Sequence, residues 1–191
     1  MKKLIKILFC FILIASVLCT MPAYANYNAV YEKSLTDSGD NSIYAQIYLL
    51  VNLDNDTVIF EKDADKQAAP ASLTKIMTAT VVLENCKDLD EEVEASYEAI
   101  HLLDGTGSSI VGLEPGEKMS IKNLLYCLLV RSGNDAANVL AMHVGGSIEG
   151  FVKMMNDKAA ALGCKNTHFA NVHGLDDPNH YTTARDLMTI T

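Results

Sequence analysis

Residues 70–79 have the sequence P-A-S-L-T-K-I-M-T-A. After Pro70 the pattern becomes helical, and it predicts a helix that continues to about Asn85. The residues predicted to share one face of this helix are Leu73, Ile76, Met77 and Thr80. Near its start, Ser72 and Lys75 are three positions apart, so their side chains are predicted to lie on one face within hydrogen-bonding reach.

This serine and lysine spacing suits nucleophilic catalysis. A serine hydroxyl is a weak nucleophile until a base removes its proton, and a lysine can be that base when desolvation or a neighbouring cation lowers its pKa. Free backbone N–H groups in the first turn of a helix can also point at a developing oxyanion. Because such short patterns arise by chance in most chains, an N-cap serine beside a solvated lysine is the simpler interpretation of the spacing taken alone.

A second polar group, Ser132-Gly133-Asn134, lies between two predicted helices. A short turn between helices can present a hydroxyl and a carboxamide together into a cleft. The Ser132 hydroxyl can then pass a proton to a leaving amine, and the Asn134 carboxamide can hold a substrate amide or orient Lys75. Serine, glycine and asparagine are also favoured in turns that have no catalytic role.

Apolar periodicity and capping residues predict the neighbouring helices. Ser120 is the predicted N-cap of a helix that we expect to be central and buried, because most of its side chains are apolar. These side chains are Ile121, Leu124, Leu125, Cys127, Leu128, Leu129 and Val130. Further helices are predicted for residues 135–143 and 147–162, and Gly163 is the predicted C-terminal stop of the second.

Three further segments of the mature chain have recognisable local signals. Residues 45–53 and 57–60 are β-prone and flank an Asp-Asn-Asp turn, which predicts a β-hairpin. Residues 104–109 lack periodicity and are a predicted loop. Thr183 and Asp186 have capping-box spacing, so a helix should begin there; because no stop signal precedes Thr191, we expect that the sequence is truncated.

These motifs resemble the D-alanyl-D-alanine carboxypeptidase family. S-x-x-K followed by S-x-N begins the signature that penicillin-binding proteins share with class A β-lactamases, which K-T-G on a strand normally completes. The sequences of residues 70–79 and of residues 132–141, S-G-N-D-A-A-N-V-L-A, are similar to that family. So is the stretch from Thr167 to Leu187, and the resemblance covers residues 44–191.

The resemblance implies an α/β (α+β) fold of the β-lactamase and DD-peptidase type. In that fold an antiparallel sheet is flanked by helices, with a mainly helical lobe between its early and late strands. Residues 26–43 would be a leader, and residues 44–191 a partial DD-peptidase (transpeptidase-like) catalytic domain whose late strands are missing from this chain.

The resemblance also implies an activity and the residues that perform it. The enzyme would remove the terminal D-alanine from peptidoglycan stem peptides, in cell wall biogenesis and the control of cell shape, and β-lactam antibiotics would acylate it. Ser72 would be the acylated nucleophile, Lys75 its activating base, Ser132 a further catalytic residue and Asn134 a substrate-binding residue. No cofactor is implied.

One departure from the family pattern matters most. No K-T-G or K-S-G occurs after Asn134, and the lysines that follow it are Lys153, Lys158 and Lys165, none in that context. In the family this strand binds the substrate carboxylate and lines the oxyanion hole. The chain of 191 residues is therefore predicted to be inactive or nearly so by itself.

Two alternatives to the peptidase stay open. A class A β-lactamase shares the fold and acylation chemistry, but residues 162–183 contain no glutamate for deacylation, and Gly133 replaces the usual aspartate of the second motif. A non-catalytic cell-wall binding protein on the same scaffold would hold a stem peptide without cleaving it. The presence of all four site residues, Ser72, Lys75, Ser132 and Asn134, favours the enzyme.

The N-terminus predicts export. Lys2, Lys3 and Lys6 accompany an apolar run, and Ala23-Tyr24-Ala25 follows, which is the pattern of a secretory signal peptide over residues 1–25. We therefore expect the protein at the cell wall or the outer face of the cytoplasmic membrane, with membrane association only through a segment beyond Thr191.

The net charge and the spacing of the cysteines and histidines disfavour nucleic acid and metal ions as partners. Removing the three signal-peptide lysines leaves 12 of 15 basic residues against 24 acidic ones, a formal charge of −12 that disfavours nucleic acid. The remaining cysteines, Cys86, Cys127 and Cys164, have no C-x-x-C spacing. The histidines His168, His173 and His180 lie in a turn-rich segment without the spacing of a helical metal pair, so no metal site is predicted.

Overall fold

A computed structural model describes residues 45–191. The predicted signal peptide and the predicted leader lie outside the described residues. The elements, in chain order, are β1 (Tyr48–Asn52), β2 (Thr57–Lys62), the 3-10 turn η1 (Ala71–Leu73), α2 (Thr74–Asn85), β3 (Glu92–Glu94), α3 (Tyr97–His101), β4 (Lys118–Ser120), α4 (Ile121–Val130), α5 (Asn134–Gly145), α6 (Ile148–Ala161) and α7 (Ala184–Ile190). None of the helices in this described part is long and apolar enough to cross a membrane.

The chain divides into two compact units. One contains residues 45–46 and 52–59, and therefore holds the tip of the predicted hairpin. The other contains residues 47–51 and 60–191, and with them every helix named above.

The hairpin prediction is confirmed, since β1 and β2 form a two-stranded sheet. Side chains stabilise the turn between the strands. Asn52 Oδ1 accepts the Asp54 N–H at 2.9 Å, and Asn55 Oδ1 accepts the Thr57 N–H at 3.2 Å. These are the local hydrogen bonds for which asparagine is favoured in turns.

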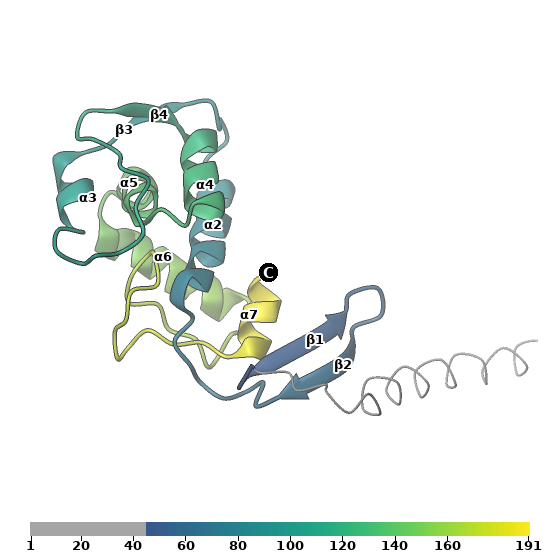
Figure 1. Cartoon of the computed structure of the whole chain (residues 1–191). Helices are drawn as coiled ribbons and strands as arrows, with labels where there is room; N and C mark the ends of the chain where they lie inside the picture. The colour runs from purple at the N-terminus through teal and green to yellow at the C-terminus, as the bar shows by residue number, and fades with distance from the viewer. Residues whose placement is uncertain (1–44) are drawn as a thin grey trace, which may run out of the picture. The chain divides into compact units, whose positions relative to one another are not determined.

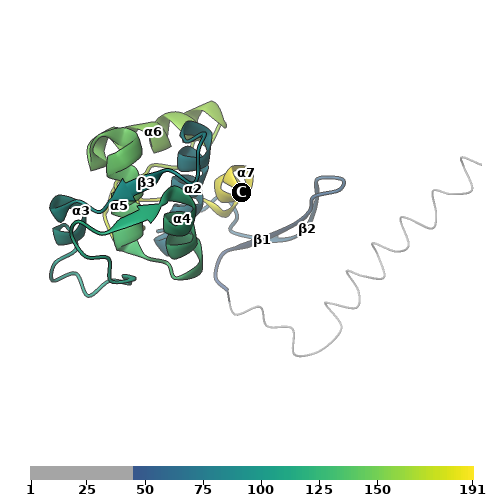
Figure 2. The same cartoon turned by 90° about the horizontal axis from the view of Figure 1, so that it is seen from above.

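Helix α5 is the centre of the larger unit. In Figure 1 it is seen nearly end-on, with α3 on one side, α2 and α4 on the other and α6 beneath it, and Figure 2 shows the same grouping from above. Its inward residues are mostly small, and Ala136, Ala137, Leu140 and Ala141 are fully buried. Small side chains let several helices approach one axis closely, which explains how α5 packs against so many neighbours.

The predicted N-caps Ser120 and Thr183 are confirmed, and the structure adds a third, Ser147. Ser120 Oγ accepts the Asn123 N–H at 3.3 Å, Ser147 Oγ accepts the Gly150 N–H at 3.0 Å, and Thr183 Oγ1 accepts the Asp186 N–H at 3.0 Å. Each bond satisfies a backbone donor that has no partner within its helix. The predicted C-terminal stop of α6 is also confirmed, because Gly163 adopts a φ of +81° just after the helix.

The expectation that the helix after Ser120 is wholly buried is wrong. Helix α4 buries Ile121, Leu124, Leu125 and Leu128, but Leu129 is 54% exposed and Val130 is 73% exposed. The helix contacts α2 and α5 along one side, so residues near its end point away from the core although they are apolar. The continuous run of apolar residues therefore predicted a wider buried face for α4 than the structure has.

The residues predicted to share one face of α2 coincide only in part with its buried side, where Met77 is completely buried. Leu73 is 52% exposed, whereas the polar residues Thr74 and Thr78 are completely buried. The segment that follows α6 donates and accepts hydrogen bonds along this side of α2, and it buries polar groups that apolar periodicity cannot identify.

A small second sheet was not predicted. Strands β3 and β4 pair antiparallel, with Val93 opposite Met119, and of the two only Val93 is fully buried. Three-residue strands are too short for an alternating pattern to be recognised in the sequence. The segment between them includes α3 and the predicted loop at residues 104–109, which contains no helix or strand.

The two faces of α4 can be compared by substituting adjacent leucines. Leu128→Ala removes a fully buried side chain and should lower the free energy of unfolding by about 2–5 kcal/mol. Leu129→Ala, on the exposed face, should change it by no more than about 0.5 kcal/mol. Urea unfolding of both variants measures the difference, and equal losses would show that Leu129 is buried.

Candidate active site

The 3-10 turn η1 carries Ser72 into the first turn of α2, where Lys75 follows. Lys75 Nζ donates a hydrogen bond to Ser72 Oγ at 3.3 Å. The residue before the serine, Ala71, has a φ of +48°, a conformation that L-residues rarely adopt. The backbone is therefore turned sharply just before Ser72, and the serine hydroxyl faces the lysine amine.

The Lys75 amine is withdrawn from water. The residue is only 3% exposed, and Nζ also donates to the His173 carbonyl oxygen at 2.7 Å. Burial lowers the pKa of Lys75 from 10.5 to about 8. A shift of this size leaves roughly one lysine in ten neutral at pH 7, so the amine is available as a base at little cost.

Ser132 reaches the same hydroxyl from the other side. Its Oγ donates to Ser72 Oγ at 3.0 Å, although 60 residues separate the two serines in the sequence. Ser132 has a φ of +56°, so the turn between α4 and α5 holds a non-glycine residue in the left-handed region. The next residue, Gly133, donates its N–H to the Cys127 carbonyl at 3.0 Å and fixes the turn to α4.

Asn134 lies beside this group at the start of α5. The residue is 4% exposed, and its backbone N–H donates to the Ser109 carbonyl at 2.9 Å. Within the described residues its carboxamide makes no hydrogen bond, and no buried polar side-chain atom there lacks a partner. The carboxamide therefore has no hydrogen-bond partner among residues 45–191 that a ligand would have to displace.

Residues 170–182 form the wall along α2 that burial of Lys75 requires. Thr78 Oγ1 donates to the Val172 carbonyl at 2.7 Å, one residue before the carbonyl that accepts from Lys75. His180 Nδ1 accepts the Ala170 N–H at 3.0 Å, so the proton of the neutral ring is on Nε2, which lies 2.7 Å from Thr74 Oγ1. Burial lowers the pKa of His180 and keeps this ring neutral.

Residues 170–182 were not predicted to belong to the site. The three histidines were expected only in a turn-rich connection, whereas His173 and His180 belong to the wall. Burial first, and then the charge of Lys75, lower the pKa of His173 to about 4, so it adds no positive charge beside the amine. The usable signal was the pair Thr74 and Thr78, two polar residues one turn apart beside Lys75.

Gly174 is required where the wall meets η1. It adopts a φ of +97°, and a Cβ atom at this position would lie 1.9 Å from the Ala71 carbonyl oxygen and 3.0 Å from the Ser72 nitrogen. Only glycine allows the two backbones to approach so closely. The contact links the strained turn before Ser72 to the carbonyl that binds Lys75.

The structure thus brings Ser72, Lys75 and Ser132 together and places Asn134 next to them. A hydroxyl between an amine of lowered pKa and a second hydroxyl is a constellation for acyl transfer through a serine ester. Among residues 45–191, no three His, Cys, Asp or Glu side chains are placed to hold a metal ion. The chemistry of these groups is proton transfer and nucleophilic attack.

Comparison with known proteins identifies relatives of this chain. Residues 33–191 match the family described as D-alanyl-D-alanine carboxypeptidase. The chain is 39% identical over 147 residues to the D-alanyl-D-alanine carboxypeptidase DacF of Bacillus subtilis, a match that covers 75% of this chain and 37% of DacF. It is 40% identical over 155 residues to DacC of Escherichia coli, covering 78% of this chain and 39% of DacC.

Solved structures give the same result. The D-alanyl-D-alanine carboxypeptidase DacD from Francisella tularensis superposes with a TM-score of 0.72 at 37% identity, covering 78% of this chain and 36% of that one. The Streptomyces K15 DD-transpeptidase superposes with a TM-score of 0.70 at 35% identity, covering 75% of this chain and 57% of that one. The expected fold is confirmed by these likenesses. The chain spans less than half the length of the curated relatives it matches.

The Gly174 contact can be tested by adding one methyl group. Gly174→Ala combines an unfavourable φ with an overlap against backbone, so it should lower the free energy of unfolding by about 2–5 kcal/mol. Gly146→Ala is the matched control, because Gly146 has a φ of +72° but nothing within 4 Å of its added Cβ, and should cost about 1–2 kcal/mol. Equal losses in urea unfolding would contradict the close approach.

Proposed function

Because the chain belongs to the D-alanyl-D-alanine carboxypeptidase family, we propose that the full-length protein that carries it removes the terminal D-alanine from peptidoglycan stem peptides. The reaction runs through an acyl-enzyme on Ser72. The observation that supports this most directly is the position of Ser72 Oγ, which lies 3.3 Å from Lys75 Nζ and 3.0 Å from Ser132 Oγ.

In the acylation step of this proposal, neutral Lys75 takes the proton of the Ser72 hydroxyl. The oxygen then attacks the carbonyl carbon of the penultimate D-alanine and forms a tetrahedral intermediate. As the C–N bond breaks, the proton passes from Lys75 through the Ser132 hydroxyl to the leaving amine of the terminal D-alanine. The lysine pKa of about 8 suits both acceptance and return of the proton near neutral pH.

Deacylation completes the cycle in the reverse sense. A water molecule attacks the ester carbonyl while Lys75 takes its proton, and Ser72 leaves as a hydroxyl. The Asn134 carboxamide is suited to bind an amide of the stem peptide during both steps, because it has no competing partner within the described residues. These roles for Lys75, Ser132 and Asn134 are part of the proposal.

The sequence has no K-T-G or K-S-G after Asn134. We therefore propose that the contacts the family makes to the substrate carboxylate and the oxyanion lie outside these 191 residues, and that the chain alone is inactive or nearly so. The binding of the reacting carbonyl by preorganised donors is a large part of such catalysis, and its loss commonly costs a factor of about 10² to 10³.

The two alternatives are less well supported. The family match is to carboxypeptidases, and no glutamate occurs in residues 162–183, which disfavours a class A β-lactamase. A non-catalytic binding protein would not need a lysine amine buried against a serine hydroxyl, because burying a lysine opposes folding at neutral pH. The peptidase accounts for that unfavourable arrangement.

Two further parts of the proposal concern partners and location. β-Lactam antibiotics would acylate Ser72, because a strained amide beside a carboxylate imitates the D-alanyl-D-alanine terminus. The predicted signal peptide at residues 1–25 and the peptidoglycan substrate both support an exported enzyme at the cell wall or the outer face of the cytoplasmic membrane.

The proposal predicts D-alanine release from an N-acylated Lys-D-Ala-D-Ala peptide by the full-length protein. Ser72→Ala should abolish release, because no acyl-enzyme can form, while leaving the fold intact. Released D-alanine is measured with a coupled assay, and circular dichroism checks the fold of the variant. Release by the Ser72→Ala variant at the parent rate would exclude Ser72 as nucleophile, and no release by the folded parent would favour the binding protein.

A further inference from the structure

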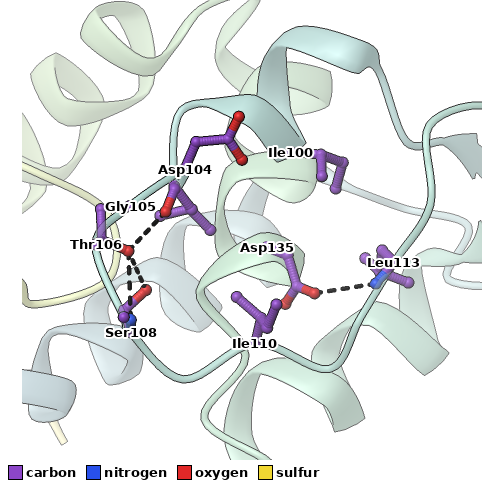
Figure 3. Close-up of a pocket in the computed structure, with 10 residues that line it drawn as sticks. Ile100, Asp104, Gly105, Thr106, Ser108, Ile110, Leu113 and Asp135 are labelled. Carbon is purple, nitrogen blue, oxygen red and sulfur yellow. Dashed lines mark hydrogen bonds between the residues drawn. The ribbon is translucent and has the colours of Figure 1, made fainter.

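A loop beside the candidate site curls over a hollow of about 280 Å³. Leu103 is one of the side chains around it, and Figure 3 shows three others, Ile100, Ile110 and Leu113. Asp135, the second residue of α5, also lines the hollow, and its carboxylate points at the backbone of the loop. No sequence motif assigns Asp135 a role, and it takes no part in the proposed acylation or deacylation steps.

Asp135 is a buried carboxylate held by backbone N–H groups. It is 2% exposed, and Oδ2 accepts the N–H of Gly112 at 2.8 Å, of Val111 at 3.0 Å and of Leu113 at 3.1 Å. Its Oδ1 accepts the N–H of Ala136 at 2.9 Å. Four donors and the positive end of α5 compensate the charge, which explains how a carboxylate can be buried here.

The segment that Asp135 binds also holds the turn that carries Ser132. We call residues 109–113 the strap. At one end of the strap, the Ser109 carbonyl accepts the Asn134 N–H at 2.9 Å, and Ser109 Oγ donates to the Arg131 carbonyl at 3.2 Å. At the other end, Asp135 binds three consecutive N–H groups. The strap is therefore hydrogen-bonded both to the turn from Arg131 to Asn134 and to Asp135, the residue that follows this turn.

Gly133 shows how closely these parts fit. A Cβ atom on Gly133 would lie 2.9 Å from Asp135 Oδ1 and 3.0 Å from Val111 Cγ1. The turn thus packs directly against the carboxylate and the strap. Ser132 stands at a φ of +56°, a conformation that persists only where surrounding contacts enforce it.

We propose that Asp135 is a positioning residue, which holds the strap against the turn and thereby fixes Ser132 and Asn134 beside Ser72. The kinetic consequence of this inference depends on the proposed function, whereas its structural consequence does not. A carboxylate is required because it accepts at every lone pair. An asparagine of the same shape would turn an NH₂ group toward backbone donors, and one side of the cluster would lose its acceptor.

The structural consequence can be measured by hydrogen exchange of the full-length protein and its Asp135→Asn variant. Exchange should accelerate in residues 109–113 and 132–136, and remain at the parent rate in α6. Ser147→Ala is the matched control, because it removes the N-cap of α6 without touching the strap. It should accelerate exchange in α6 and leave the turn unchanged.

The kinetic consequence is a slower acylation of Ser72 by penicillin, followed by intact mass. Displacement of catalytic groups by about 1 Å commonly costs up to about 100-fold, so Asp135→Asn should slow acylation by roughly 10- to 100-fold. The pH midpoint of acylation should not move, because Lys75 keeps its surroundings. Ser147→Ala should acylate at the parent rate, which separates positioning from a general loss of stability.

Each outcome decides the inference. Parent-like exchange in the strap and turn of a folded Asp135→Asn protein would overturn it, as would parent-like acylation. If that variant does not fold, Ser109→Ala replaces it, because the exposed Ser109 hydroxyl binds the turn from the same strap. Unchanged hydrogen exchange at residues 131–134 of the Ser109→Ala variant would then overturn the inference. A parent protein that penicillin does not label would contradict the proposed function, while hydrogen exchange would still test Asp135.

Discussion

The burial of the Lys75 amine is the constraint on which the rest of the site depends. Moving the pKa from 10.5 to about 8 makes the folded chain less stable at neutral pH by on the order of 3 kcal/mol. Because the folded state binds fewer protons between these two values, this penalty lessens as the pH rises from about 8 toward 10.5. Neighbouring contacts must supply the compensation, and the hydrogen bonds between residues 170–182 and α2 are among them.

The same site holds two non-glycine residues in the left-handed region, Ala71 and Ser132. Each is enforced by a different segment. The wall at residues 170–182 presses Gly174 against the Ala71 carbonyl, and the strap at residues 109–113 binds the turn that contains Ser132. Ser72 thus receives hydrogen bonds from two sides because two separate parts of the chain hold strained turns in place.

Local signals in the sequence predicted much of this arrangement. The caps Ser120 and Thr183 act within three residues of themselves, and the spacing of Ser72 and Lys75 is set by one helical turn, so both could be predicted without tertiary information. Ser132 lies far from Ser72 in the chain. Its place beside Ser72 was implied by the family resemblance, not by any local pattern.

What the sequence did not predict depends on packing between distant segments. The buried threonines of α2 are polar, so apolar periodicity did not identify them as inward residues, although it did group the buried Met77 with the exposed Leu73. The carbonyl that binds Lys75 belongs to the backbone of His173 and has no sequence signature. The sequence predicts for Asp135 only a place at a helix start, because three of its backbone N–H partners lie more than 20 residues away.

The most direct test of this account is the titration of Lys75 in the folded protein. Lysine labelled with carbon-13 at Cε reports the protonation of each amine by NMR, and a Lys75→Arg variant assigns the resonance. We predict that the Lys75 amine titrates with a midpoint near pH 8, because it is buried against Ser72 and His173. A midpoint near 10.5, the ordinary lysine value, would show a solvated ammonium and would contradict the role of Lys75 as the base.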